Sequence, residues 1–227
     1  MKGQWIGSFE GQNEGLIMVN VDDRETHFEG IAYLNVSNNQ LPSSAASFTT
    51  RNKDKEFEFR TTNILPINPI NGVVDSWDTL KKFYDQDISI SKYADIKGTW
   101  DDNYIELSWT TDLGTQGNCK LPKSQADQPS KLLPLEMDWK GFKEYVSTLK
   151  EGRRFLFRGQ NTLRRLRTSF HRAGRSDLIR FVNEDIPALH RHLSARTKHV
   201  FKLEIPDENG AFFNLVQHHG YPTPLLD

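Results

Sequence analysis

The residues best suited to chemistry lie in two short segments of the second half of the chain. The first segment is Phe157-Arg158-Gly159-Gln160, at the end of the apolar run 154–158. This run predicts a strand, and an arginine at its end would present a guanidinium to a cleft. The fork of donors on a guanidinium binds a pyrophosphate bidentately, which a lysine does not reproduce. The alternative is a surface arginine that pairs with a nearby carboxylate.

The second segment, residues 217–227, carries two adjacent histidines at the end of a predicted helix. At such a place one imidazole typically caps the last carbonyls, and the other faces a pocket or solvent. We expect either His218 or His219 to donate a hydrogen bond in a pocket. We expect no metal site, because suitably spaced further ligands are missing and His190 and His192 point to different faces of a helix.

An arginine-rich stretch lies between the two segments. Its basic side chains are Arg164, Arg165, Arg167, His171, Arg172 and Arg175. Clustered arginines supply the phosphate contacts of nucleic-acid binding, although Phe170 is the single aromatic residue in the stretch that could stack on a base. The alternative is a solvated basic face that docks on an acidic surface of the same chain.

The first 122 residues predict the scaffold, an antiparallel β domain. Apolar runs or strict alternation of apolar and polar residues occur at 4–9, 16–21, 27–34, 56–60 and 104–109. Alternation with period two is typical of half-buried strands, and turn residues separate the runs. We expect seven or eight strands in a barrel or sandwich, with a loop at 63–72 and a short helix at 76–84. Trp5, Trp100 and Trp109 are expected in the core, and a small ligand in a barrel mouth stays open.

Helices and a linker are expected in the remainder. Residues 123–137 hold two prolines without periodicity and predict a linker. Asp138 caps a predicted helix that leads into the strand carrying Arg158. A second helix is expected after Ser176, with Pro187 as a kink, then a short strand at 200–205 and a last helix at about 208–218.

The charge distribution and the cysteine content bear on the domain organisation and on the cellular compartment. Residues 1–137 carry 13 basic and 20 acidic side chains, whereas residues 138–227 carry 16 and 10. This difference predicts either two domains with different partners or two halves that attract each other. The single cysteine, Cys119, excludes an internal disulfide and favours a reducing compartment. Because the chain has neither a membrane-length apolar run nor a leader, we expect a cytoplasmic protein without membrane contact.

The two segments, in this order, resemble the FRG-domain family, which is named for a Phe/Tyr-Arg-Gly motif. The second hallmark of the family is Gln-His-x-Gly-x-Pro-Thr-x-Leu-Leu-Asp, and residues 217–227 read Gln-His-His-Gly-Tyr-Pro-Thr-Pro-Leu-Leu-Asp. The resemblance covers about residues 138–227. The chain departs from the family at Pro224, where members usually have arginine. Because the family pattern continues past Leu-Leu-Asp, we expect an α+β FRG-like domain that is incomplete at its C-terminus.

The family is distantly similar to the ADP-ribosyltransferase fold, in which a first-strand cation helps to bind NAD and a later glutamate orients the nicotinamide ribose. The resemblance therefore implies catalytic roles for Arg158, His218 and His219. It implies NAD or nucleotide contacts from Arg158, Gly159, Gln160, Gln217, Tyr221 and Thr223. The glutamate is expected beyond Asp227, so this chain is expected not to turn over NAD by itself. Family members occur in bacterial and phage-related proteins, often beside toxin or defence modules.

Two other functions stay open at this point. The chain could be a non-catalytic sensing module whose β domain recognises a protein partner, or it could bind nucleic acid through its arginines. Glycine-rich phosphate loops, Gly-x-Ser-x-Gly elbows and zinc motifs are absent from the sequence. Their absence argues against the common kinases, hydrolases and Rossmann-fold enzymes as classes for this protein.

Overall fold

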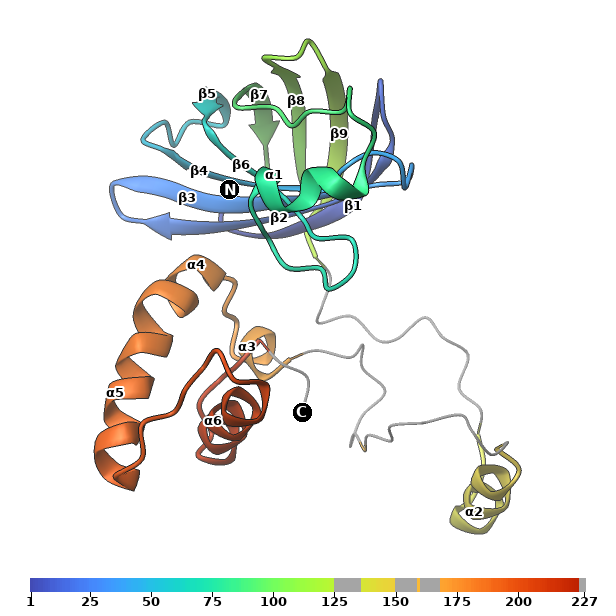
Figure 1. Cartoon of the computed structure of the whole chain (residues 1–227), viewed down its shortest axis with the longest axis vertical. Helices are drawn as coiled ribbons and strands as arrows, with labels where there is room; N and C mark the ends of the chain where they lie inside the picture. The colour runs from blue at the N-terminus through green and yellow to red at the C-terminus, as the bar shows by residue number, and fades with distance from the viewer. Residues whose placement is uncertain (125–135, 150–158, 160–167, 225–227) are drawn as a thin grey trace. The chain divides into compact units, whose positions relative to one another are not determined.

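The computed structural model describes residues 1–124, 136–149, 159 and 168–224 (Figure 1). The chain divides into two compact units, one made of Met1–Ser124 with Thr168–Asp227 and one of Gln125–Arg167. Among the described residues, no helix has the length and apolarity to cross a membrane.

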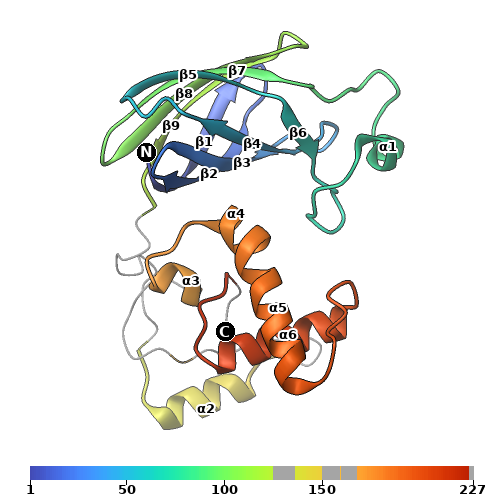
Figure 2. The same ribbon diagram turned by 90° about the vertical axis from the view of Figure 1, so that its left-hand side faces the viewer.

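Nine antiparallel strands form the N-terminal part of the chain. They are β1 (Gly3–Gly11), β2 (Gly15–Arg24), β3 (His27–Val36), β4 (Ser44–Thr50), β5 (Glu56–Thr61), β6 (Asn63–Pro66), β7 (Ala94–Trp100), β8 (Tyr104–Thr111) and β9 (Gln116–Pro122). Their order in the sheet is β5-β7-β8-β9-β1-β2-β3-β4-β6, and β4 also contacts β5. The sheet therefore curls into a nearly closed barrel (Figures 1 and 2). The predicted α+β class is confirmed, and the barrel is the correct alternative for its β part.

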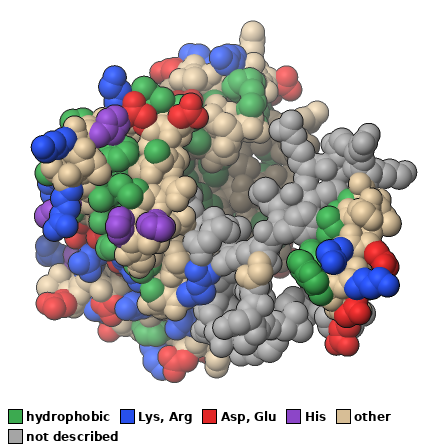
Figure 3. Space-filling view, turned by 90° about the horizontal axis from the view of Figure 1, so that it is seen from below, with side chains coloured by type: hydrophobic (Ala, Val, Ile, Leu, Met, Phe, Trp, Pro, Cys, Tyr) green, Lys and Arg blue, Asp and Glu red, His purple; other side chains and the backbone are tan. Residues whose placement is uncertain are grey.

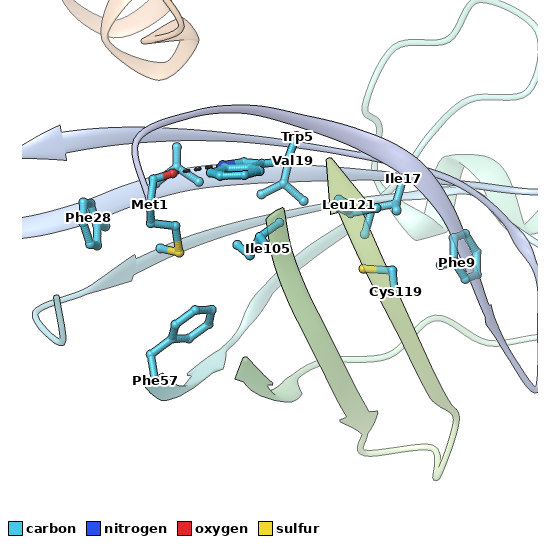
Figure 4. Close-up of a cluster of buried hydrophobic side chains, with 11 residues drawn as sticks. Met1, Trp5, Phe9, Ile17, Val19, Phe28, Phe57, Ile105, Cys119 and Leu121 are labelled. Atoms are coloured by element: carbon cyan, nitrogen blue, oxygen red, sulfur yellow. Dashed lines mark hydrogen bonds between the residues drawn. The ribbon is translucent and has the colours of Figure 1, made fainter. Parts of the chain in front are cut away.

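The barrel interior follows from the alternation of side chains along each strand. In β9, Gly117, Cys119 and Leu121 are buried while their neighbours are exposed. The inward side chains form one apolar cluster (Figure 4), in which Trp5 is 1% exposed and donates its indole N–H to the Met1 carbonyl at 2.9 Å. Trp100 and Trp109 pack against this cluster as expected. Burial raises the pKa of the Cys119 thiol to about 12, so this side chain packs as an apolar group.

The outer face of β5 and β7 is charged. Cross-strand ion pairs join Arg60 Nε to Asp95 Oδ1 at 2.7 Å and Lys97 Nζ to Glu58 Oε1 at 3.2 Å. Exposed pairs of this kind add little stability individually. They do fix which face of the sheet meets water, because a one-residue slip would carry these charges into the barrel.

One buried carboxylate in β2 makes stability depend on pH. Asp22 is 5% exposed and its Oδ1 has no hydrogen-bond partner among the described residues. Burial raises the pKa of Asp22 to about 6, whereas the pKa of an aspartate in an unfolded chain is about 4. The folded protein therefore holds a proton that the unfolded chain releases, and the free energy of unfolding falls as pH rises from about 4 to about 6.

We expect Asp22→Asn to remove this dependence and to raise the free energy of unfolding at pH 7 by about 1–2 kcal/mol. Urea unfolding of both proteins at pH 4, 5, 6 and 7 measures the effect. Asp102→Asn, at an exposed turn position, serves as the control and should give a curve parallel to the wild type. A slope that is unchanged in Asp22→Asn would contradict the prediction.

The first two α-helices begin at the caps that the sequence predicts. Ser76 accepts a hydrogen bond from the Thr79 N–H before α1 (Trp77–Leu80), which continues into the 3-10 turn η1 (Lys81–Phe83). Asp138 accepts from the Gly141 N–H at 2.7 Å before α2 (Trp139–Ser147). Both predicted helix starts are thereby confirmed.

The regular elements among the described residues of the C-terminal part are helices joined by turns and loops. It contains α3 (Ser169–Arg172), α4 (Leu178–Arg180), the π-helical turn η2 (Phe181–Asp185), α5 (Ile186–Thr197) and α6 (Pro206–His218). Phe170, Phe181 and Phe212 are at most 1% exposed and, with Val216, form the buried core of this part. The Phe170 and Phe181 rings meet edge to face at 5.4 Å. Pro187 lies in the first turn of α5, where its missing N–H is tolerated, and the wide turn η2 precedes it.

Two predicted elements are wrong. Residues 63–66 belong to strand β6 and not to a loop. Asn63 pairs with Ser47 of β4, and Pro66 pairs with Ser44 of the same strand. Residues 200–205 form no strand. Phe201 instead packs its ring on Phe212 at 5.7 Å, so its apolar side chain is satisfied by the helical core.

Candidate functional site

The segment that follows α6 is fixed by a Schellman turn. His219 is the C-cap residue of α6. Gly220 follows it with φ +78°, a left-handed conformation that favours glycine. The Gly220 N–H donates to the Gln217 carbonyl at 2.8 Å, and the Tyr221 N–H donates to the Val216 carbonyl at 3.1 Å. These two bonds satisfy the last carbonyls of α6 and reverse the chain. The glycine of the second motif is thus required by the backbone.

Thr223 attaches this segment to the start of α3. Its side chain is completely buried. The Thr223 N–H donates to Ser169 Oγ at 3.0 Å, and the Phe170 N–H donates to the Thr223 carbonyl at 3.0 Å. Gln217 Nε2 donates to Thr223 Oγ1 at 2.6 Å. Gln217 and Thr223, both predicted to contact a nucleotide, therefore also bind each other inside the fold.

Arg175 is the centre of a partly buried charge cluster. Its Nε and Nη2 donate to the two carboxylate oxygens of Asp177 at 2.9 and 2.7 Å, and Nη2 also donates to Asp185 Oδ2 at 2.6 Å. The guanidinium carbon lies 4.5 Å from the centre of the Phe170 ring. Nη1 donates to the Tyr221 hydroxyl at 3.3 Å. This single side chain therefore ties α3, η2 and the second motif together.

The charge cluster shifts the pKa of its members. Burial alone would raise the pKa of Asp177, but the hydrogen bonds and charge of Arg175 outweigh it and hold this pKa below its ordinary value. Burial and a hydrogen bond with Asp185 raise the pKa of the Tyr221 phenol. Tyr221 is therefore a neutral hydroxyl at physiological pH, available as a hydrogen-bonding group and not as an anion.

His218 and His219 lie exposed at the C-terminal end of α6, with their ring centres 5.6 Å apart. Histidine side chains are open to solvent on the surface shown in Figure 3. The geometry leaves both imidazoles accessible, and the pocket role expected for one of them stays a prediction. Within residues 1–124, 136–149, 159 and 168–224, no group of three or more His, Cys, Asp or Glu is arranged to hold a metal ion.

The first motif falls largely outside the described residues. Arg158 and Gln160 are not described, and neither are Arg164, Arg165 and Arg167 of the arginine-rich stretch. Gly159 is exposed, and a Cβ built on it would meet no atom within 4 Å. The phosphate-binding role of Arg158 therefore stays a prediction, as do the roles of Gly159 and Gln160.

Sequence reasoning missed the structural role of Arg175. It placed this residue in a basic stretch available to nucleic acid, whereas Asp177 and Asp185 engage its guanidinium. The signal available in the sequence was the spacing Arg175-x-Asp177 immediately before a helix. An arginine and an aspartate two residues apart form a bidentate ion pair only when the backbone turns between them. The local sequence does not specify that turn.

The comparisons with known proteins comprise a family match in the C-terminal part of the chain and similarities to solved β barrels. Residues 153–227 match the family model described as the FRG domain. The comparison with curated proteins gives no match. Among solved structures, the redesigned β barrel mFAP1 bound to DFHBI is 12% identical with a TM-score of 0.36, covering 54% of this chain and 94% of that one. The redesigned barrel b11L5F_LGL is 11% identical with a TM-score of 0.35, covering 55% and 91% respectively. In its C-terminal part, over residues 153–227, this chain therefore carries an FRG domain.

Proposed function

We propose that the FRG domain binds NAD or a related nucleotide, as an ADP-ribosyltransferase-like module of a bacterial or phage toxin or defence system. The match of residues 153–227 to the FRG domain carries this proposal. It is supported by the way the second motif is built. The part-buried Gln217–Thr223 hydrogen bond and the turn at Gly220 hold the segment, while His218 and His219 stay exposed.

Each proposed contact has a physical reason. The Arg158 guanidinium would bind the pyrophosphate through paired N–H donors. The exposed imidazole of His218 or His219 would donate a hydrogen bond from a ring N–H to the ligand. The neutral Tyr221 hydroxyl, held by Arg175 at 3.3 Å, would add a polar contact beside them. The Gly159 backbone leaves room for close approach of a ligand.

Calorimetric titration of the 227-residue chain with NAD, ADP-ribose and nicotinamide tests the proposal. We expect binding of NAD and ADP-ribose without turnover of NAD. Arg158→Ala should weaken the affinity at least tenfold, because a charge-assisted hydrogen bond contributes about 1.5–3 kcal/mol. Arg191→Ala removes an exposed arginine of α5 and should leave the affinity unchanged. His218→Ala and His219→Ala are compared in the same way with His192→Ala, an exposed histidine of α5.

Two results would count against nucleotide binding. One is an absence of heat with all three ligands while circular dichroism shows a folded protein. The other is equal weakening by Arg158→Ala and Arg191→Ala, which would indicate general charge attraction. Either result would favour the sensing or protein-interaction module, to be followed by pull-down with the acidic barrel as bait.

A further inference from the structure

The two ends of the barrel are filled differently. At one end the inward side chains are large and closely packed, and Trp5, Val21 and Leu121 are at most 1% exposed. At the other end the paired inward residues are small. Ala32 faces Ala46 between β3 and β4, and Thr61 faces Ala94 between β5 and β7.

These small side chains leave a cavity of about 370 Å³ at that end of the barrel. Its apolar walls include Leu34, Val36, Ile96 and Leu107, all of which keep partial solvent exposure although they point inward. Aliphatic side chains that face a barrel interior without being buried lose hydrophobic stabilisation. A volume of this size, lined mainly by apolar groups, is what small-molecule sites typically provide.

An aromatic wall adds shape to the cavity. The Trp109 ring meets the Phe9 ring edge to face at 5.7 Å, and both line the cavity. A Cβ placed on Gly117 would come within 2.4 Å of Trp109 Cζ2. The glycine thus lets the indole lie against β9 and keeps it out of the cavity space. The ring consequently borders the cavity as a flat wall suited to a flat ligand.

The charge of the lining restricts the ligand further. Asp87 is the single ionisable residue among those that line the cavity, so the lining offers no cation to an acid. The polar members are otherwise hydroxyls and amides, such as Thr111, Thr115 and Asn13. Burying an unpaired carboxylate or sulfonate beside such walls is costly. A neutral ligand therefore fits the cavity and an anionic one does not.

We propose that the open end of the β barrel is a binding site for a small, neutral, mostly apolar molecule with one or two aromatic ring systems. The ligand would stack beside Trp109 and place a polar group among the threonine hydroxyls. This site lies wholly in the barrel and is independent of the nucleotide proposed for the FRG domain.

A pair of dyes with the same skeleton tests both the site and its charge preference. N-phenyl-1-naphthylamine is neutral, and 1-anilinonaphthalene-8-sulfonate carries one sulfonate. We expect the full chain to bind the neutral dye with one-to-one stoichiometry and at least tenfold more tightly than the anionic dye. Equal or tighter binding of the anionic dye would overturn the assigned ligand class.

Filling the cavity locates the site. Ala46→Phe projects a phenyl ring into the cavity and should weaken binding of the neutral dye at least tenfold. Thr110→Phe adds the same ring at an exposed position of β8 and should change the affinity less than twofold. Unchanged affinity in folded Ala46→Phe would overturn the proposal.

A second measurement needs no variant. In methyl NMR spectra of the wild-type chain, the neutral dye should shift the signals of Ile64 and Ile96, which line the cavity. The methyls of Val19 and Ile105, in the packed core, should move far less. Shifts spread over both ends, or shifts that do not saturate, would show binding elsewhere and reject the site.

Discussion

Replacing Trp5 with alanine is expected to lower the free energy of unfolding of the barrel by about 3–5 kcal/mol. Trp5 is 1% exposed and belongs to the apolar cluster in Figure 4, together with Val19, Ile105 and Leu121. Truncation removes the largest apolar side chain of this cluster and leaves a cavity that the closed strands cannot collapse to fill. It also removes the indole donor to the Met1 carbonyl.

Thermal and urea unfolding followed by circular dichroism measure the effect of this substitution. Trp139→Ala is the matched control, because Trp139 is 71% exposed on α2 and its removal should change stability by less than about 0.5 kcal/mol. If Trp5→Ala and Trp139→Ala shift the unfolding midpoint by the same small amount, Trp5 does not hold the barrel core together.

The strands that sequence analysis recognised are those with large alternating side chains. In Glu56–Thr61 the pattern of Phe57 and Phe59 between charged residues is unambiguous. The strand β4, with sequence Ser-Ala-Ala-Ser-Phe-Thr-Thr, carries alanine and serine at inward positions, so apolar periodicity is weak. The same small residues that hid this strand are those that leave the barrel end hollow.

Proline obscured the strand β6. Pro66 cannot donate a backbone hydrogen bond, and sequence reasoning therefore assigned residues 63–72 to a loop. In the structure Pro66 is the last residue of an edge strand, where its missing N–H costs nothing to the ladder. Whether a proline ends a strand or excludes one depends on the neighbouring strand, which local sequence does not specify.

In the C-terminal part the sequence predicted caps and motifs better than it predicted partners. Asp138 caps α2 as expected, because capping is a local interaction. The contacts of Thr223 with Ser169 and Phe170 join residues that are 54 and 53 positions apart, and periodicity carries no information on such pairs. The motif could therefore be recognised from its residues, but its scaffolding bonds could not.

Arg175→Ala is expected to destabilise the C-terminal helical part by about 2 kcal/mol, because removal of one member of a partly buried charge cluster takes the charge-assisted hydrogen bonds from its partners. The side chains of Arg175, Asp177 and Asp185 are only 21%, 21% and 13% exposed. The substitution also removes the guanidinium that covers Phe170 and holds Tyr221. Arg175→Lys should recover only part of the loss, because an ammonium cannot bind both Asp177 oxygens and Asp185 in the same plane.

Hydrogen exchange of the α3 and α6 amides in the full chain measures this destabilisation locally, because each amide reports the opening of its own segment. Arg191→Ala, at an exposed position of α5, should leave exchange unchanged. The pKa of Asp177 is held below its ordinary value, so the contribution of the cluster is present above that ordinary value and is lost as pH falls through the lowered one. Relative to the intrinsic exchange rate at each pH, the protection of the wild-type amides should therefore fall at acid pH towards that of Arg175→Ala. Equal protection of α3 in the two proteins at neutral pH would show that the cluster does not hold the second motif in place.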